Sequence, residues 1–279
     1  MPRSFASATP DRITFSLGAG ASVNGAITLA GIARKATDTG AAATILTVGN
    51  AAASRRTLLL SNANVIQLRS NNATDGATTF TAAEGWALIC VTKAAGTATA
   101  RTHKYVYSTN TWTHANTPGT LGDSTPTSNS LIGTGGGTAA PWNGDIAVAS
   151  AWAAAFTDAQ VESLPFSLPA WFQVSPNGLW VLDQSATGML VNDLTGNGAN
   201  QSAITGTTVG TSNVPVFSYG APIVVALHQP PAQSAALTPA TITVTPVAVG
   251  ASPGTVSLAL TQERWPKIGF FTTRELSAT

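Results

Sequence analysis

The sequence predicts an all-β sandwich. Two features lead to this class: short apolar segments with alternating or continuous patterns recur along the chain, and Gly, Asn, Ser and Thr residues that favour turns separate them. Before residue 157, no stretch repeats its apolar residues with the 3.6-residue period of a helix. About ten such strands are enough to build one large β domain.

The composition points to a protein that works within an assembly. Asp, Glu, Lys and Arg make up only 9% of the 279 residues, against about 25% in ordinary domains. The formal net charge of +1 excludes long-range attraction to nucleic acid or acidic lipid. Because so little charge opposes self-association, we expect a homo-oligomer or a larger assembly.

The strands expected before residue 108 alternate or form apolar runs. The segment 12–17 places Ile13, Phe15 and Leu17 on one face. A hairpin is expected around residues 62–64, where two asparagines tolerate left-handed turn geometry. Cys90 lies in a nearly continuous apolar run, so we expect a buried thiol without reactivity. The segments are 12–17, 26–33, 43–48, 56–61, 65–69, 78–81, 86–92 and 97–107.

Residues 108–127 are expected to form a long polar loop that contains an aromatic candidate site. Trp112 is surrounded there by Tyr107, Asn110 and His114. An exposed tryptophan with amide and hydroxyl groups nearby is a typical platform for a sugar ring. The alternative is that Trp112 only packs this loop against the sheet.

The stretch 142–164 contains the most specific local pattern. Residues 145–152 alternate, which places Ile146, Val148, Ser150 and Trp152 on one face of a strand. We expect Ile146 and Trp152 to pack in the core between two sheets.

A short capped helix is expected directly after this strand. Thr157 and Gln160 have the spacing of a capping box, and Phe156 and Val161 have that of a hydrophobic staple. Pro165 ends the helix after about two turns. Beyond it we expect an extended segment at 165–169, strands at 178–183 and 203–209, and a turn at 192–200.

The chain changes character after residue 220. Prolines recur there, and two alternating segments, 241–245 and 255–261, are expected to pair as a hairpin. A lone hairpin is marginal in water, so it requires a surface to pack on. We therefore expect residues 221–279 to form an extended docking arm, with its apolar contacts made by Trp265, Ile268, Phe270 and Phe271.

The sequence does not indicate catalysis or a bound cofactor. Glycoside hydrolysis requires two carboxylates, yet of the four glutamates only Glu162 has an acidic residue two to four positions away, Asp158, and both belong to the expected capped helix. His103, His114 and His228 lie on separate segments without metal-ligand spacing, so we expect no zinc site. Asp145 with Asn143 offers oxygen ligands for calcium, as does the Asp193 turn, but we favour side-chain hydrogen bonds that shape turns at both places.

Several motifs resemble the laminin-G-like, concanavalin A-like jelly rolls of phage and bacterial proteins. The first resembles the strand and short helix with which such domains typically end, carried by Trp142, Gly144, Ile146, Ala147, Trp152, Phe156, Thr157, Val161 and Leu164. The second comprises residues 178–183, 193–198, 205–208 and 214–216. The start of the chain also resembles the family, so the likeness covers about residues 1–219. It implies an antiparallel two-sheet jelly roll over residues 1–220.

The resemblance also implies a function. Members of this simple architecture often resemble bacteriophage virion proteins, so our first hypothesis is a non-enzymatic minor tail or capsid-surface component in the virion. Its partners would be other virion proteins. The second hypothesis is a carbohydrate-binding module that contacts host-surface glycan, and a glycoside hydrolase is the third. We expect no nucleic-acid partner, no signal peptide and no insertion into a membrane.

Overall fold

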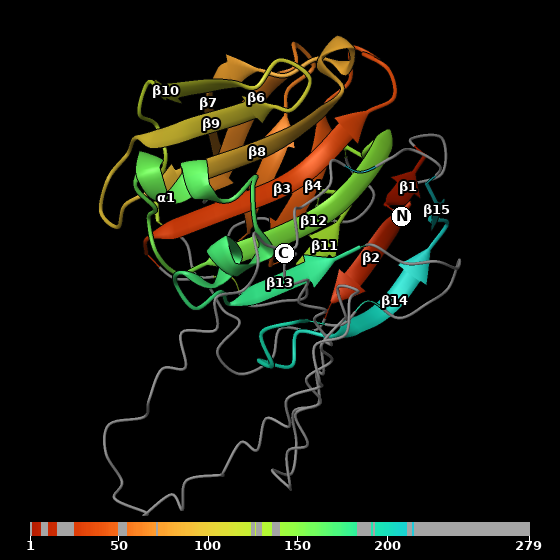
Figure 1. Cartoon of the computed structure of the whole chain (residues 1–279). Coiled ribbons are helices and arrows are strands. Elements are labelled where there is room, and N and C mark those ends of the chain that lie inside the picture. The colour runs from red at the N-terminus through yellow and green to blue at the C-terminus, as the bar shows by residue number, and fades with distance from the viewer. Residues whose placement is uncertain are drawn as a thin grey trace, which may run out of the picture. The chain divides into compact units, whose positions relative to one another are not determined.

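The described part of the chain is an all-β jelly-roll sandwich. The computed structural model describes residues 2–6, 11–15, 25–49, 55–70, 72–123, 126, 130–135, 140–182, 191, 193–210 and 214. Within these ranges, two antiparallel sheets pack face to face, with one short α-helix on the outside (Figure 1). The predicted all-β, two-sheet fold class is confirmed. The predicted arm at 221–279 lies outside the described residues and stays a prediction, as does its boundary.

The first sheet contains eight described strands. Its order is β10-β9-β8-β3-β12-β1-β15, and β13 also pairs with β12. The long central strands come from the apolar runs that the sequence analysis identified. The strands are β1 (Arg3–Phe5), β3 (Ile27–Lys35), β8 (Trp86–Lys93), β9 (Ala100–Val106), β10 (Thr111–Asn116), β12 (Gly144–Trp152), β13 (Gly178–Val181) and β15 (Thr208–Val209).

The second sheet contains seven described strands in the order β14-β2-β11-β4-β5-β6-β7. The predicted hairpin is present, and Asn64 adopts the left-handed conformation, with φ of 61°, at its turn. A short 3-10 turn, η1 (Ala82–Glu84), connects this sheet to β8. The strands are β2 (Arg12–Phe15), β4 (Ala43–Val48), β5 (Arg56–Leu60), β6 (Val65–Ser70), β7 (Ala73–Thr79), β11 (Ser130–Ile132) and β14 (Gln201–Thr205).

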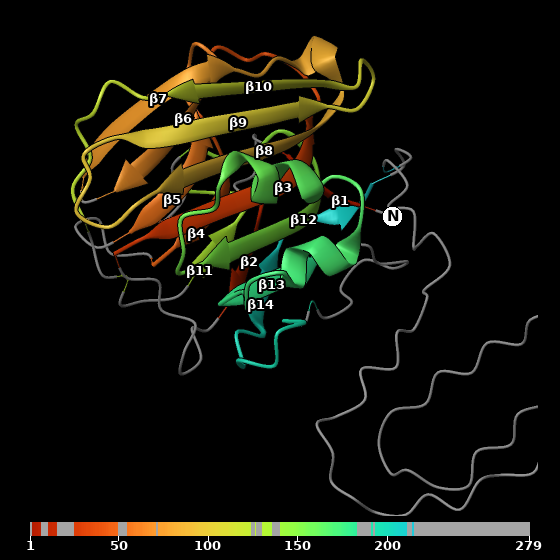
Figure 2. The same cartoon turned by 60° about the vertical axis from the view of Figure 1, so that its left-hand side comes forward.

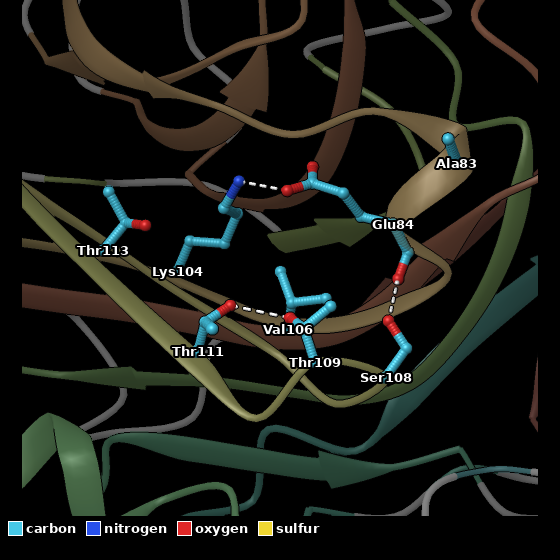
Figure 3. Close-up of a pocket in the computed structure, with 8 residues that line it drawn as sticks. All are labelled: Ala83, Glu84, Lys104, Val106, Ser108, Thr109, Thr111 and Thr113. Atoms are coloured by element: carbon cyan, nitrogen blue, oxygen red, sulfur yellow. Dashed lines mark hydrogen bonds and ion pairs between the residues drawn. The ribbon is translucent and has the colours of Figure 1, made fainter.

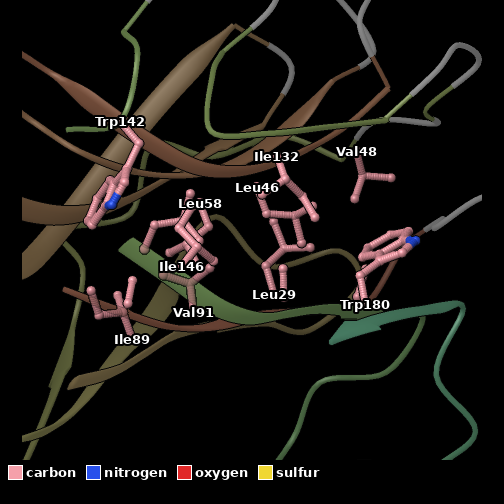
Figure 4. Packing of buried hydrophobic residues seen from close by; sticks show 14 of the residues in the cluster. Leu29, Leu46, Val48, Leu58, Ile89, Val91, Ile132, Trp142, Ile146 and Trp180 are labelled. Atoms are coloured by element: carbon pink, nitrogen blue, oxygen red, sulfur yellow. The ribbon is translucent and has the colours of Figure 1, made fainter. Parts of the chain in front are cut away.

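A single apolar core fills the space between the sheets. Leu29 and Ile89 of the first sheet meet Leu46 and Leu58 of the second, and all four are fully buried. Trp142 and Trp180 lie at opposite ends of this cluster (Figure 4). Burial of this apolar surface is the main term that stabilises the sandwich.

The alternation of side chains between the two faces of strand β12 is interrupted, contrary to our expectation. Its register shifts between Ile146 and Val148, which is a β-bulge that turns two successive side chains to the same face. Ile146 packs between the sheets as predicted. Val148 and Trp152 pack on the outer face instead. The prediction that Trp152 lies in the inter-sheet core is therefore wrong.

The helical segment after β12 covers this outer face. Helix α1 (Asp158–Ser163) has the predicted capping box, in which Thr157 Oγ1 accepts from Gln160 N and Gln160 Oε1 accepts from Thr157 N. The expected extended segment at 165–169 instead leads into a 3-10 turn, η2 (Leu168–Phe172), which proline at its start permits. Figure 2 shows the helical segments in front of the first sheet. Helix α1 contacts β9 and β10 through Asp158 and Glu162, whereas the ring centroid of Trp171 in η2 lies 5.6 Å from that of Trp152 in β12.

The loop expected at 108–127 contains a strand. Residues 111–116 form β10, which pairs in register with β9 at the edge of the first sheet. The turn between them closes because Asn110 adopts a left-handed φ of 53°. Threonines alternate with Trp112 and His114 along this segment, and that alternation is the signal that the loop prediction missed. No helix in the described ranges is long and apolar enough to cross a bilayer.

Candidate functional site

Strand β10 presents two different chemical surfaces. Its register with β9 places Thr111 opposite Val106 and Thr113 opposite Lys104, on the face turned toward the second sheet. Lys104 confirms this direction, since its Nζ donates to the carbonyl oxygen of Thr79 at the end of β7, at 2.7 Å. Side chains in a strand alternate, so Trp112 and His114 lie on the outer face, which α1 covers.

On the inner face, a hollow of about 420 Å³ opens between η1, β9 and β10. This is within the range of pockets that hold small ligands. Hydroxyl groups from the β9–β10 hairpin line one side, and Lys104 with Glu84 form the other side (Figure 3). The lining residues are Ala83, Glu84, Lys104, Val106, Ser108, Thr109, Thr111 and Thr113.

The charged groups of the hollow are held in place. Lys104 Nζ forms an ion pair with Glu84 Oε1. The other carboxylate oxygen of Glu84 accepts from the backbone N–H of Thr81 at 2.8 Å, as part of the capping box of η1. Ser108 Oγ donates to the backbone oxygen of Glu84 at 3.3 Å, which ties the β9–β10 turn to η1. The hollow therefore has preformed walls from two parts of the chain.

The aromatic residues predicted as a sugar platform lie on the other face. Trp112 is half-buried, its ring stacked on His114 with centroids 5.2 Å apart and 5.0 Å from the Tyr105 centroid. The Asn110 side-chain oxygen accepts from the hydroxyl of Tyr105 at 2.5 Å. Tyr107 donates to the carbonyl oxygen of Pro165 at 3.2 Å, and burial raises the pKa of its hydroxyl.

These contacts match the packing alternative that the sequence left open for Trp112. The structure brings Trp112 and His114 together and gives Asn110 and Tyr107 partners within the chain. A sugar-binding role for these four residues stays a prediction. The inner-face hollow was missed because residues 108–127 were expected to be a loop, which hid the register of Thr111 and Thr113 with β9.

Beneath Trp112, two of the histidines that lie on separate segments of the sequence meet in the structure. His103 of β9 is the cross-strand partner of His114 of β10, and their Nδ1 atoms are 2.8 Å apart. His103 is fully buried, and burial, together with the nearby His114, lowers its pKa to about 3 against the opposing effect of Asp158. Asp158 and Glu162 of α1 complete a polar cluster around this pair.

The oxygen ligands considered for calcium have other partners. The carboxylate of Asp145 is buried and accepts from Arg34 Nε and Nη2 at 3.1 and 2.6 Å, and it also accepts from the Ser4 hydroxyl. The side chain of Asn143 donates to Thr37 Oγ1 at 2.9 Å. Asp145 therefore forms an ion pair with Arg34, and calcium binding at Asp145 and Asn143 stays a prediction.

Asp193 adopts the turn role that the sequence analysis considered. Its Oδ1 accepts from the backbone N–H groups of Leu179 and Thr195 at 3.0 and 3.1 Å, and its Oδ2 accepts from the Thr195 hydroxyl. Such side-chain-to-backbone bonds shape turns. Cys90, as expected, is completely buried, and burial raises the pKa of its thiol.

Comparison with known proteins gives partial similarities of fold. No protein-family model and no curated protein sequence matches the chain. A native heptameric SAP-like pentraxin from Limulus polyphemus matches with 13% identity and a TM-score of 0.41, covering 58% of this chain and 80% of the pentraxin. The CBM40 of the Ruminococcus gnavus IT-sialidase matches with 14% identity and a TM-score of 0.37, covering 51% and 83%.

A third similarity is with tailspike protein 2 of the Escherichia coli O157:H7 bacteriophage CAB120. It has 12% identity and a TM-score of 0.40, and the match covers 65% of this chain and 26% of the tailspike. The chain's own two antiparallel sheets and their strand order define its fold as a jelly-roll sandwich.

Proposed function

We propose that this jelly roll is a non-enzymatic carbohydrate-binding protein and that the hollow between η1, β9 and β10 is its saccharide site. The proposal is supported by the hydroxyl-lined hollow of about 420 Å³, which has the Lys104–Glu84 ion pair on one wall. Sugar hydroxyls both donate and accept hydrogen bonds. Threonine and serine hydroxyls do the same, whereas an ammonium group donates and a carboxylate accepts. The hollow therefore offers hydrogen-bond donors and acceptors to a sugar.

The contacts of Glu84 favour saccharide binding over hydrolysis of a glycosidic bond. Glycosidases place two carboxyl groups on either side of the scissile bond, one of them as a proton donor. Both oxygens of Glu84 are instead engaged, one with Lys104 and the other with the backbone N–H of Thr81. Glu84 is also the one carboxylate among the described residues that line the hollow, and its remaining lone pairs can accept hydrogen bonds from sugar hydroxyls.

A glycan array probed with the full chain tests this function. The test variant is Thr111→Val with Thr113→Val, which keeps side-chain shape and strand preference but removes two exposed hydroxyls from the hollow. Loss of two hydrogen bonds of about 1 kcal/mol each predicts about 10- to 30-fold weaker binding. Thr205→Val, at an exposed position of β14, is the matched control.

The array has clear outcomes. Binding of one glycan class by the wild type and the control, with loss in the double variant, supports the proposal. No binding by the wild type, or equal binding by the double variant, contradicts it. Loss of binding only in Trp112→Ala would assign the site to the outer aromatic face instead.

We further propose that the protein is a bacteriophage virion component, a minor tail or capsid-surface protein that contacts host glycan. The low charge content supports an assembled state. The apolar residues of the proposed arm, Trp265, Ile268, Phe270 and Phe271, would then dock on another virion protein or on a second copy.

Mass spectrometry of purified particles tests this setting. Particles produced with the full chain are expected to contain it, and particles produced with residues 221–279 deleted are expected to lack it. Circular dichroism must show that the deleted form keeps its β-sheet structure. Absence of the full chain from particles would contradict the virion role, and unchanged incorporation of the deleted form would contradict the docking arm.

A further inference from the structure

Two histidines on neighbouring strands point their ring nitrogens at one another. His103 and His114 are direct partners in the β9–β10 ladder, and their rings are nearly perpendicular, at 76°. The two Nδ1 atoms lie 2.8 Å apart. The strand pairing fixes both Cα atoms, so this convergence is built into the hairpin.

Helix α1 adds a carboxylate to the same point. Asp158 and Glu162 are four residues apart, so they lie on the same face of the helix, and that face is turned toward the two histidines. Asp158 Oδ1 is 3.7 Å from His103 Nδ1. One donor atom from each of His103, His114 and Asp158 lies within 4.8 Å of the other two.

The second ring nitrogen, Nε2, of each histidine also has a hydrogen-bond partner. His103 Nε2 is 3.1 Å from Thr92 Oγ1 on β8, and His114 Nε2 is 3.1 Å from Glu162 Oε1 on α1. Histidines that bind metals usually have a hydroxyl, carbonyl or carboxylate partner on the second nitrogen, which orients the ring and fixes the tautomer. Both rings therefore have the supporting contacts that would leave Nδ1 to face an ion.

We propose that His103 Nδ1, His114 Nδ1 and Asp158 Oδ1 bind a divalent transition-metal ion of the zinc class. Two nitrogens and one carboxylate oxygen form a ligand set that suits zinc and its neighbours, whereas calcium and magnesium prefer oxygen ligands alone. The fourth position of a tetrahedral site is open to water, because the Asp158 side chain is 40% exposed.

The geometry requires movements of His114 and of Asp158, whose Oδ1 lies 3.7 Å from His103 Nδ1. With metal–nitrogen bonds of about 2.0–2.1 Å, two ligands of a tetrahedral ion lie about 3.3 Å apart, so the Nδ1 atoms must separate by about 0.5 Å from their hydrogen-bond distance. His114 sits on the edge strand and its side chain is 16% exposed, so its ring can rotate by this amount. His103 is fully buried and serves as the fixed ligand.

Arg101 is the group that competes with the ion. Its Nε and Nη2 donate to the two oxygens of Asp158 at 2.7 and 2.6 Å. Each carboxylate oxygen has two lone pairs, so Oδ2 can keep the guanidinium while Oδ1 turns to the ion. Arg101 also donates from Nη1 to Asn116 at 2.9 Å and is 36% exposed, so it has an alternative partner and solvent when the ion binds.

The proposal does not rest on the proposed glycan site, because Thr111 and Thr113 lie on the opposite face of β10. The test uses the full chain without an affinity tag, titrated with Zn²⁺ against a chromophoric chelator. A parallel titration with Co²⁺ reports coordination geometry from its visible absorption. The wild type is expected to bind one ion per chain and to give the spectrum of a tetrahedral or five-coordinate site.

Three variants separate this site from adventitious binding. His114→Gln removes one proposed ligand and is expected to weaken binding by at least about 100-fold. Glu162→Gln is expected to weaken it by about 10- to 100-fold, because the hydrogen-bond partner of His114 Nε2 is lost. His228→Gln removes the third histidine of the chain and is expected to leave binding unchanged. Urea unfolding without metal must show that each variant is folded.

Several results would overturn the proposal. These are the absence of stoichiometric binding by the wild type, equal affinity in the folded His114→Gln variant, or loss of the ion in His228→Gln. If His114→Gln fails to fold, Asp158→Asn replaces it, since Asp158 is exposed enough to be changed without opening the core. Unchanged affinity in that variant would equally contradict the assignment.

Discussion

Replacing Thr28 with valine is expected to loosen the junction between β12 and α1. Thr28 lies on β3 and is fully buried. Its Oγ1 donates to the carbonyl oxygen of Ala154 at 2.7 Å and accepts from the backbone N–H of Phe156 at 3.0 Å. One hydroxyl thus satisfies two backbone groups in the segment that leads from the strand into the helix.

The magnitude follows from what the substitution leaves unpaired. Valine has the same shape, so packing is retained while both hydrogen bonds are lost. A buried backbone group without a partner costs about 1–3 kcal/mol. The N–H of Phe156 is buried and bears this cost in full, whereas Ala154 is half-exposed and its carbonyl can turn to water. Thr28→Val should therefore lower the free energy of unfolding by about 2–3 kcal/mol.

Thr44→Val is the matched control and is predicted not to lower the free energy of unfolding. Thr44 is also buried in a strand, but its Oγ1 meets no hydrogen-bond partner among the described residues. Replacing a buried, unpaired hydroxyl with a methyl group is expected to be neutral or to stabilise by up to about 1 kcal/mol. Urea unfolding followed by tryptophan fluorescence measures both changes. Equal effects in the two variants would refute this reasoning.

Further predictions concern pH, reactivity and packing. His103 titrates near its ordinary pKa of 6.5 when unfolded but near 3 when folded, so the unfolded chain binds more protons between these values. The free energy of unfolding should therefore fall as pH drops from about 6.5, by up to about 1.4 kcal/mol per pH unit. Urea titrations at about pH 7 and pH 5 with a chelator present test this sign, and stability that rises toward pH 5 would contradict it. The buried Cys90 should not react with a chromogenic disulfide reagent until urea unfolds the chain; rapid labelling of the native protein would disprove its burial. Gly31→Ala would bring a Cβ to 2.7 Å from Ile45 Cγ2 and should lower the free energy of unfolding by about 1–3 kcal/mol. An unchanged urea midpoint would contradict the close packing of β3 against Ile45.

Much of the sandwich follows from local patterns. The apolar runs around Leu29 and Cys90 gave β3 and β8, and the asparagine turn at Asn64 gave the β5–β6 hairpin. The capping box at Thr157 correctly predicted where α1 begins. These features are decided by residues close together in sequence, so the sequence contains the necessary information.

The predictions that failed depend on contacts between residues that are far apart in the sequence. The bulge after Ile146 depends on pairing with β3, and without it Trp152 was assigned to the wrong face. Edge strand β10 was mistaken for a loop because its polar residues hide a short alternation. Since His103 and His114 meet only when that strand pairs with β9, their juxtaposition was also missed.

A crystal structure of the full chain with the saccharide that binds best on the array would locate the sugar on the sandwich. The proposed function predicts electron density for the sugar in the hollow, with hydrogen bonds to Lys104, Glu84 and the hydroxyls of Thr111 and Thr113. Density over the outer face at Trp112, or anywhere else on the sandwich with the hollow left to solvent, would contradict it.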